Sequence, residues 1–216
     1  SLDSGSPLGA RRGDLAWSSE FLDTFADWAL MMRGETIPAS SSGLHYTQLE
    51  PYGVVGRIIP FNHPALFAAS KVAAPLLAGN SVVLKASEQC PLSAIRIGEL
   101  AAEVFPPGVF NVVTGAGPLS GQAIVRSPKV ARIAFIGSET TGREIQRSAA
   151  ESAVKNVTLE LGGKNAMVVL ADADPLAAAE GAVKGMNFTA TQGESCGSHS
   201  RLLVHRSIID EVVNGV

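Results

Sequence analysis

Two short segments of this chain carry side chains that could do covalent chemistry. Glu160-Leu161-Gly162-Gly163-Lys164 supplies a carboxylate, and Gln192-Gly193-Glu194-Ser195-Cys196 supplies a thiol 36 positions further on. A thiol is the most nucleophilic side chain at neutral pH, because a few per cent is ionised even at an unperturbed pKa of about 8.5. A carboxylate beside it could activate water against an acylated sulfur. The pair therefore predicts chemistry through a thioester.

The same loop allows hydrolase alternatives. Gly193-Glu194-Ser195-Cys196-Gly197 fits the G-x-S-x-G pattern, in which Ser195 would be the nucleophile. That arrangement needs an acid and then a histidine further along the chain, and no histidine follows Asp210. A Cys196–His199 thiol hydrolase meets another difficulty, because residues three apart in a tight loop seldom hold the orientation that a dyad requires. A hydrolase using Ser195 or Cys196 remains the alternative to thioester chemistry.

Composition excludes several function classes. The chain has 216 residues, of which 46% are hydrophobic and 17% charged, with a formal net charge of -3. This balance predicts a sizeable core and no basic surface for nucleic acid. Apolar runs are too short to span a membrane, and Ser1–Gly5 does not resemble a signal peptide. We therefore expect a cytoplasmic protein without membrane or nucleic-acid partners, although the absence of a starting Met leaves the native N-terminus unseen.

Cysteines and histidines give no metal pattern. Cys90 and Cys196 are too few for a disulfide framework and fit a reducing compartment, so we expect both to be free and Cys90 to be structural. Cys196-x-x-His199 is the only ligand-like spacing, and it would need two further partners that the sequence does not offer. No metal site is predicted.

The first quarter of the chain predicts a helix followed by turns. Residues 14–33 place apolar side chains at three- and four-residue spacing, which indicates an amphipathic helix whose aromatic stripe faces the core. Pro38–Gly43 is a turn-rich break, and residues 46–49 predict a short extended piece.

From Gly53 onward, short apolar runs alternate with helical patterns. Strands are predicted over 54–60, 81–85, 109–113, 132–136, 157–161 and 166–170. Helices are predicted over 64–78, 91–105, 119–126 and 139–150. This alternation predicts an α/β fold with a doubly wound, mostly parallel, Rossmann-like sheet and helices on both faces.

The last quarter predicts a further helix and a further strand. Asp174 as N-cap and Pro175 at the first helical position predict a helix over 174–189, and residues 201–205 predict a strand. Cys196 lies in the glycine-rich loop between them, which is where catalytic groups are often held by rigid elements.

Two strand-to-helix turns could bind a nucleotide. The first turn contains Gly117 and Gly121 in a G-x-G-x-x-x-G pattern, one residue longer than the dinucleotide fingerprint, and no acidic residue follows at the usual distance. The second contains Gly137, Ser138 and Thr141 at a helix start, where exposed amides favour an anion such as pyrophosphate. An ordinary glycine turn and a simple N-cap at Ser138 are the alternatives.

Five motifs occurring in order resemble the aldehyde dehydrogenase superfamily. The resemblance runs from about Asp3 to the last residue. It rests on Pro60-Phe61-Asn62-His63-Pro64, Lys85-Ala86-Ser87-Glu88, Phe135-Ile136-Gly137-Ser138, the Glu160 segment and Gly193-x-x-Cys196.

The resemblance implies a role for each reactive group. Cys196 would attack an aldehyde, and Glu160 would activate water against the thioester that forms after hydride transfer. Asn62 and the Cys196 amide would stabilise the oxyanion, a contribution of about 2.7–4 kcal/mol for such donors. Lys71 matches a lysine assigned to a proton relay. Taken alone, Asn62 could be a turn residue and Lys71 a polar position on its helix.

The resemblance also implies a cofactor site. Lys85 and Glu88 match positions that bind the adenosine ribose, and a carboxylate there would repel a 2′-phosphate, so NAD is expected rather than NADP. The cofactor residues implied are Ile58, Ile59, Pro60, Phe61, Lys85, Ser87, Glu88, Gly117, Gly121, Gly137, Ser138, Thr141 and Leu161.

Four positions depart from the family pattern. Phe61 and His63 replace the usual aromatic pair, Ile136 stands where threonine is common, and Ala86 stands where proline is common. These changes are expected to alter packing around the cofactor without removing a reactive group.

Family members are longer at both ends, so the resemblance implies an internal portion of an enzyme. Residues 1–162 would form most of a cofactor domain, and residues 163–216 would begin a catalytic domain. The full-length protein is expected to be a homodimer or homotetramer acting on a small aldehyde whose identity the sequence does not fix. The chain alone is expected to be nearly inactive, and a catalytically inactive nucleotide-binding fragment is the alternative.

Overall fold

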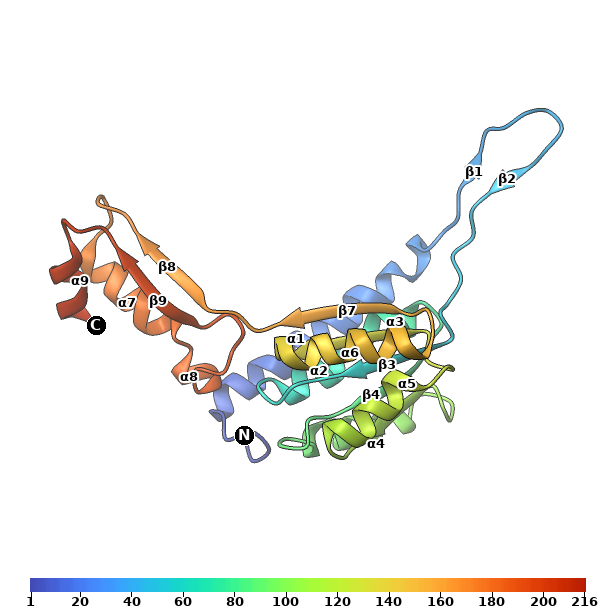
Figure 1. Cartoon of the computed structure of the whole chain (residues 1–216), viewed down its shortest axis with the longest axis horizontal. Helices are drawn as coiled ribbons and strands as arrows, with labels where there is room; N and C mark the ends of the chain where they lie inside the picture. The colour runs from blue at the N-terminus through green and yellow to red at the C-terminus, as the bar shows by residue number, and fades with distance from the viewer.

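A computed structural model describes all 216 residues, and its centre is a five-stranded parallel sheet (Figure 1). The strands lie in the order β5-β4-β3-β6-β7, with every neighbouring pair parallel. Their bounds are β3 (Val54–Ile58), β4 (Ser81–Lys85), β5 (Phe110–Val113), β6 (Arg132–Gly137) and β7 (Asn156–Leu161). The chain builds outward from β3 in one direction and then returns to build outward in the other. The predicted doubly wound α/β sheet is confirmed.

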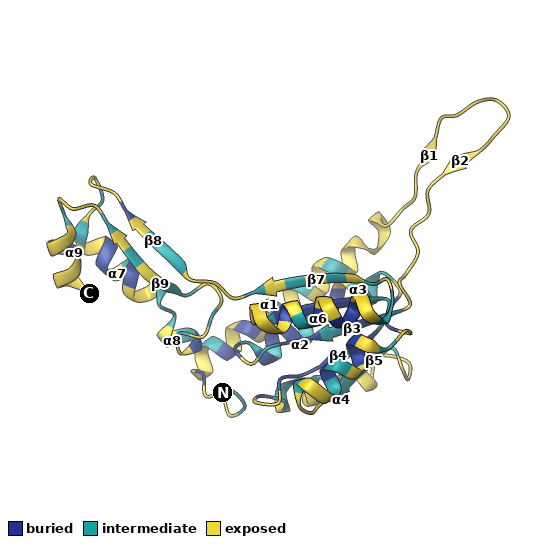
Figure 2. Cartoon of the chain, viewed as in Figure 1, coloured by how far each residue is buried: buried dark blue, intermediate teal, exposed yellow.

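Helices cover both faces of this sheet, because parallel strands with near-continuous apolar side chains must be buried on both sides. One face packs against α5 (Gln122–Arg126) and α6 (Glu139–Ser152), and its core includes Ile133, Phe135 and Ile145. The other face packs against α2 (Pro64–Ser70), α3 (Ala73–Leu77) and α4 (Leu92–Ala102). Its core includes Val82, Leu84 and Ala94, all fully buried. Figure 2 shows the buried residues concentrated in the sheet and the helices against it.

The helix predicted over 64–78 is interrupted, because α2 ends at Ser70 and α3 begins at Ala73. Pro75 explains the interruption. A proline lacks an amide hydrogen and its ring clashes with the carbonyl four residues earlier, which here belongs to Lys71. The chain therefore turns at Lys71 and Val72 before resuming, and this places the Lys71 side chain at a helix end.

The edge strand β7 is covered on one face only. Asn156, Thr158 and Glu160 are exposed, whereas Val157, Leu159 and Leu161 alternate with them and pack toward α6. Because side chains alternate along a strand, Glu160 projects from the open face of the sheet near the carboxyl end of β7.

A second, two-stranded parallel sheet follows. It pairs β8 (Asn165–Val169) with β9 (His199–Val204), and α7 (Pro175–Gly185), α8 (Phe188–Thr191) and α9 (Ile209–Gly215) accompany it. Asp174 caps α7, since its Oδ1 accepts the Ala177 amide at 2.8 Å. The helix predicted over 174–189 ends early, because Asn187 adopts a left-handed conformation with φ 58° and separates α7 from α8. The sequence analysis did not predict α9.

The N-terminal segment forms α1 (Leu8–Asp27) and a 3-10 turn, η1 (Trp28–Met31), followed by a projecting hairpin. The hairpin pairs β1 (Thr36–Ile37) with β2 (His45–Tyr46), so the extended piece predicted over 46–49 is only partly a strand. The helix predicted over 14–33 begins earlier and ends earlier than expected. No helix in the structure combines the length and apolarity needed to cross a bilayer.

The prediction that the aromatic stripe of this helix faces the core is wrong. Leu22, Trp28 and Met32 are 40%, 48% and 41% exposed, and Phe21 and Phe25 are only half-buried. These rings pack mainly on their own helix, with Trp17 and Phe21 at 5.3 Å and Phe25 and Trp28 at 5.1 Å between ring centroids. The α1 helix contacts α2 and α3, and residues outside the aromatic stripe, including Arg11 and Ser18, are the ones that become buried.

We predict that Gly56→Ala lowers the free energy of unfolding by about 1–3 kcal/mol, because the added methyl group overpacks the core. A Cβ at Gly56 would lie 2.5 Å from Ile124 and 2.9 Å from Ile133. Urea denaturation measures the change. Gly13→Ala is the matched control: nothing lies within 4 Å of a Cβ there, so alanine should stabilise α1. Equal effects of the two substitutions would contradict this account of the core.

Candidate active site

The expected cofactor residues gather along one edge of the main sheet. Ile58 ends β3, Lys85 ends β4, Gly117 follows β5, Gly137 ends β6 and Leu161 ends β7. All five strands are parallel, so their carboxyl ends meet at the same edge. Ligands of doubly wound sheets bind in the crevice beyond these ends, at the point where the strand order reverses. That point lies here between β3 and β6.

The start of α6 has the geometry of an anion-binding turn. Ser138 is its N-cap, and its Oγ accepts the Thr141 amide at 3.3 Å and donates to the Thr141 hydroxyl at 2.9 Å. Gly137 precedes the cap, where a Cβ would lie 2.4 Å from the Phe135 ring. Glycine is therefore required on steric grounds. The N-cap role of Ser138 coexists with free amides in the first turn, which can face a phosphate.

Lys85 and Glu88 form an ion pair at this edge, with Nζ and Oε2 2.7 Å apart. The Lys85 side chain is 4% exposed and that of Glu88 is 51% exposed, so the lysine is held below the rim and the carboxylate faces solvent. Glu88 Oε1 also accepts the Gly117 amide at 3.4 Å. The hydrogen bonds from Lys85 and from backbone amides lower the pKa of Glu88, which keeps it anionic at neutral pH.

A cavity of about 690 Å³ opens between these residues and the helices α5 and α6. Five of the expected cofactor residues line it: Ile58, Glu88, Gly117, Gly121 and Thr141. The sequence analysis missed its helical wall, which includes Gln122, Arg126 and Glu144. Their position one or two turns into the helices that follow the glycine turns is the signal that could have indicated them. The Gln122 amide donates to Glu144 Oε1 at 3.3 Å.

Two of the four departures from the family pattern take buried positions. Ile136 and Ala86 are 6% and 0% exposed, and both belong to the core cluster beneath α2 and α4. Phe61, in contrast, is 37% exposed. His63 has polar contacts instead, with the Asp14 carboxylate, and its ring packs edge-on against Phe67 at 5.6 Å.

Glu160 and Cys196 are brought together although Glu160 belongs to the main sheet and Cys196 to the loop that precedes β9. Cys196 is exposed in the loop between α8 and β9, and Cys90 is buried beside the start of α4; both are free thiols. Partial burial raises the pKa of the Cys196 thiol, and the charge of Glu160 and a hydrogen bond to its carboxylate raise it further. No other charged side chain contributes to this shift. The ionisation of the Cys196 thiol therefore depends on the charge of the Glu160 carboxylate.

Backbone contacts shape the loop that carries Cys196. The Thr191 hydroxyl accepts the Ser195 amide at 3.1 Å, and the Ser195 hydroxyl accepts the Gly197 amide at 3.1 Å. The side-chain amide of Asn165 donates through Nδ2 to the carbonyls of Cys196 and Ser198. Ser195 is therefore used in the turn and contacts no histidine, so the geometry gives no support to a Ser195 hydrolase.

Asn62 contacts the same loop from the other sheet. Its side chain is buried, and Nδ2 donates to the Glu194 carbonyl at 3.0 Å. A side-chain amide has two hydrogens, so one remains after this bond. The Asn62 side chain therefore lies against the backbone two residues before Cys196, where a second donor could act on a developing oxyanion.

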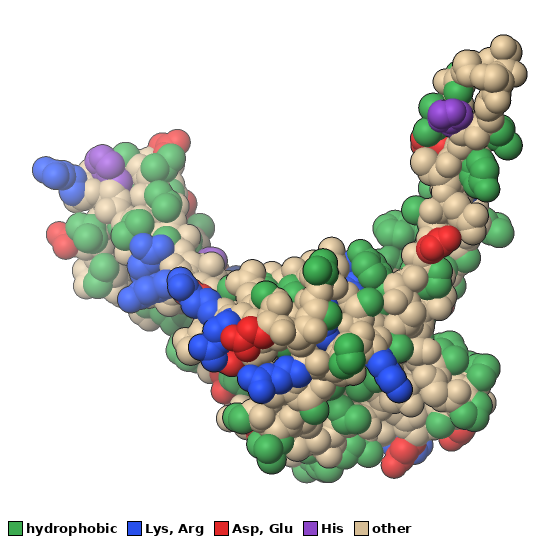
Figure 3. Space-filling model, turned by 45° about the vertical axis from the view of Figure 1, so that its right-hand side comes forward, with side chains coloured by type: hydrophobic (Ala, Val, Ile, Leu, Met, Phe, Trp, Pro, Cys, Tyr) green, Lys and Arg blue, Asp and Glu red, His purple; other side chains and the backbone are tan.

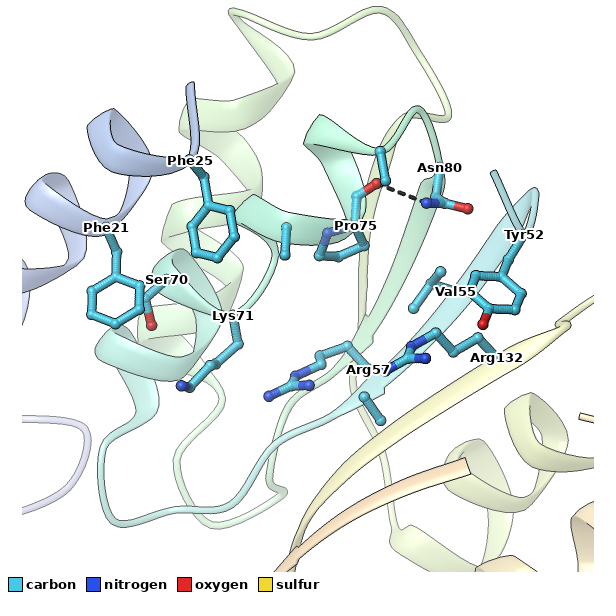
Figure 4. A pocket seen from close by; sticks show the side chains of 13 residues that line it. Phe21, Phe25, Tyr52, Val55, Arg57, Ser70, Lys71, Pro75, Asn80 and Arg132 are labelled. Carbon is cyan, nitrogen blue, oxygen red and sulfur yellow. Dashed lines mark hydrogen bonds between the residues drawn. The ribbon is translucent and has the colours of Figure 1, made fainter. Parts of the chain in front are cut away.

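Lys71 lies in a separate pocket on the open face of the sheet. The pocket has a volume of about 430 Å³, and Figure 4 shows Lys71 and Arg57 extending into it opposite the rings of Phe21 and Phe25. The Lys71 ammonium is 5.5 Å from the centroid of the Phe21 ring. Desolvation and the neighbouring Arg132 charge lower the pKa of Arg57 to about 10, an effect that the Glu160 charge opposes. No contact joins Lys71 to Glu160 directly.

We predict that Glu160→Gln lowers the pKa of the Cys196 thiol, because the substitution removes the negative charge that opposes ionisation. At any pH below that pKa, a larger fraction would be thiolate and alkylation by iodoacetamide would be faster. The pH dependence of the alkylation rate, measured in a Cys90→Ser background, gives the midpoint. Glu151→Gln, a surface substitution on α6, should leave the midpoint unchanged. A midpoint that stays or rises in Glu160→Gln would refute the coupling.

Comparison with known proteins agrees with this geometry. The aldehyde dehydrogenase family model matches residues 1–216. Aldehyde dehydrogenase tropH of Talaromyces stipitatus is 44% identical over 216 residues, which are 99% of this chain and 41% of the relative. An NAD+ complex of an aldehyde dehydrogenase from Bacillus cereus superposes with a TM-score of 0.92 at 42% identity, covering 99% of this chain and 43% of that one.

PnpE from Pseudomonas sp. WBC-3 likewise superposes with a TM-score of 0.92 at 40% identity, covering 99% of this chain and 44% of that one. The chain thus spans less than half the length of these relatives. With a family match along every residue and the same fold in solved relatives, the chain belongs to the aldehyde dehydrogenase family.

Proposed function

We propose that this chain carries the cofactor site and the reactive thiol of an enzyme that oxidises an aldehyde to a carboxylic acid with NAD, through a thioester on Cys196. The observation that carries the proposal is the coupling of Cys196 to Glu160 across 36 positions and two sheets. A nucleophile beside a base, next to a dinucleotide-type sheet edge, meets the requirements of this reaction class.

In the proposed first step, the Cys196 sulfur forms a bond to the aldehyde carbon, and the thiol proton passes to the Glu160 carboxylate. The carbonyl oxygen becomes an oxyanion. Bound NAD supplies the acceptor for the hydride that leaves the same carbon, and a thioester remains on the sulfur. Glu160 releases this proton to solvent and then removes a proton from water as the water oxygen attacks the thioester. The carbon–sulfur bond breaks, the proton passes from Glu160 to the departing sulfur, and the carboxylic acid and the free thiol are released.

The raised pKa of Cys196 fits this sequence. The shift favours the protonated thiol, and the neighbouring Glu160 carboxylate can accept its proton at the moment of attack. Once the sulfur is acylated, the carboxylate no longer faces a thiol and is available to water. One carboxylate can therefore serve both steps.

Asn62 is the proposed side-chain donor to the oxyanion. Its amide is fixed by the Glu194 carbonyl and by burial, so it needs little reorganisation during the reaction. Preorganised donors of this kind supply about 2.7–4 kcal/mol of transition-state stabilisation. Lys71 is proposed to relay protons from the open face of the sheet, through the pocket that it shares with Arg57.

The sheet edge fits NAD by its own chemistry. The amides at the start of α6 suit the pyrophosphate, and the anionic Glu88 can accept hydrogen bonds from ribose hydroxyls. The Bacillus cereus relative, which binds NAD+, supports this assignment. We propose that residues 1–162 form the cofactor domain and that residues 163–216 begin the catalytic domain.

We predict that Cys196→Ala abolishes aldehyde oxidation in the complete gene product, because the sulfur that forms the thioester is removed. Glu160→Gln should still allow a first turnover, because the lower pKa of the Cys196 thiol then supplies thiolate without a proton acceptor, and should slow release of the acid, since the base for water is lost. A rapid burst of NADH followed by a steady rate at least about 100-fold slower would be seen in stopped-flow absorbance. Cys90→Ala is the matched thiol control and should remain active. Unchanged turnover in Cys196→Ala would refute the proposed function.

We also predict that Glu88→Gln improves the use of NADP relative to NAD by roughly tenfold, about 1.4 kcal/mol, because the charge that repels a 2′-phosphate is removed. Steady-state kcat/KM with each cofactor measures the ratio. Glu99→Gln on α4 is the control, since Glu99 pairs only with Arg96 at the surface. A cofactor ratio that does not change in Glu88→Gln would contradict the assignment of Glu88 to the ribose.

A further inference from the structure

A buried ion-pair network at the start of α1 joins three segments of the candidate site. Arg11 and Asp14 are 6% and 9% exposed, and Arg11 Nη1 lies 2.6 Å from Asp14 Oδ2. Long charged side chains are seldom buried unless they are paired and hydrogen-bonded. The family resemblance assigns no role to either residue, and the sequence analysis began this helix at Asp14.

The Arg11 guanidinium reaches two backbone carbonyls from separate segments. Nη1 donates to the Asn62 carbonyl at 3.0 Å, and Nη2 donates to the Ala190 carbonyl at 2.8 Å. Asn62 belongs to the proposed oxyanion loop after β3, whereas Ala190 lies in α8, just before the Cys196 loop. The planar guanidinium of Arg11 therefore sets the separation between the two segments that the proposed reaction must hold together.

Asp14 fixes the orientation of this fork and also binds the residue after Asn62. The Asp14 carboxylate lies 3.1 and 3.2 Å from His63 Nδ1, through its two oxygens. His63 stands where the family pattern has an aromatic residue. The histidine and the carboxylate are thus part of the same network as Arg11, and both constrain the segment that presents the Asn62 amide.

Besides the hydrogen bond between the Cys196 thiol and the Glu160 carboxylate, few other contacts join the Cys196 loop to the segments around the main sheet. Asn62 Nδ2 donates to the Glu194 carbonyl at 3.0 Å, and the Ser6 hydroxyl donates to Gln192 Oε1 at 3.5 Å. Arg11 is the only charged donor among these contacts, and its hydrogen bond to the Ala190 carbonyl is 2.8 Å long. A charged donor gives roughly twice the strength of a neutral one, so Arg11 makes the strongest link between the Asn62 segment and the segment that precedes the Cys196 loop.

We propose that Arg11 is a positioning residue that holds the Asn62 amide and the Cys196 loop in register by binding the carbonyls of Asn62 and Ala190. The proposal rests on the proposed thioester chemistry. It makes Asp14 the anchor of the guanidinium and explains why α1, which carries no reactive group, buries charged residues against the site. A misplacement of about 1 Å costs roughly a hundredfold in rate, so a loss of register is measurable.

The main test is Arg11→Lys in the complete gene product. Lysine keeps the charge opposite Asp14 but cannot bind both carbonyls with a planar fork. We expect kcat to fall roughly ten- to hundredfold, with the NAD dissociation constant unchanged within about twofold. Arg12→Ala, which removes the exposed neighbouring arginine, is the matched control and should leave both values unchanged. An Arg11→Lys variant with normal kcat, or with NAD affinity lost together with kcat, would overturn the proposal.

A double-mutant cycle with Asn62→Ala separates positioning from a general structural role. If Arg11 acts by placing the Asn62 amide, Arg11→Lys should reduce kcat by less than about threefold once that amide is absent. If the two single-mutant reductions in kcat multiply in full in the double mutant, Arg11 acts on something other than the Asn62 amide, and the proposal is overturned. Failure of the proposed function is seen separately, as wild-type protein without NAD-dependent aldehyde oxidation or as an active Cys196→Ala variant.

Discussion

The register of the five parallel strands is the constraint on which the rest of the site depends. Ile58 pairs with Lys85 on one side and with Phe135 on the other, and Gly137 pairs with Leu161. These pairings align the carboxyl ends of the strands along one edge of the sheet. A slip of one residue would turn the apolar side chains of a strand to its other face, so burial on both faces makes this register costly to change.

The two candidate catalytic groups depend on this sheet in different ways. Glu160 is part of β7 itself, and its direction follows from strand alternation. Cys196 lies in the loop that leads into β9 of the second sheet, and the chain reaches it through α7 and α8. The left-handed residues Asn187 and Gln192 end these helices and turn the loop back toward the main sheet. Hydrogen bonds from Asn62 and Arg11 then hold it there.

Much apolar surface remains exposed around this centre. Figure 3 shows hydrophobic side chains along the projecting hairpin, where Ile37, Leu44 and Tyr46 are 47%, 76% and 63% exposed. The aromatic stripe of α1 adds to this surface. Helix amphipathicity shows that a face prefers an apolar environment, but it does not show which part of the protein supplies it. The apolar spacing of the stripe is therefore as predicted, but its side chains are not buried within this chain.

The sequence alone predicts the alternation of strands and helices, the doubly wound sheet and the motifs of the family, because periodicity, turn residues and reactive types are local properties. It located Glu160, Cys196 and the residues at the strand ends. Only the tertiary structure decided that the thiol meets the carboxylate, that Pro75 divides a helix beside Lys71, and that Arg11 joins Asn62 to Ala190. Those outcomes depend on contacts between segments far apart in the chain, and on side chains whose burial is settled by packing rather than by local pattern.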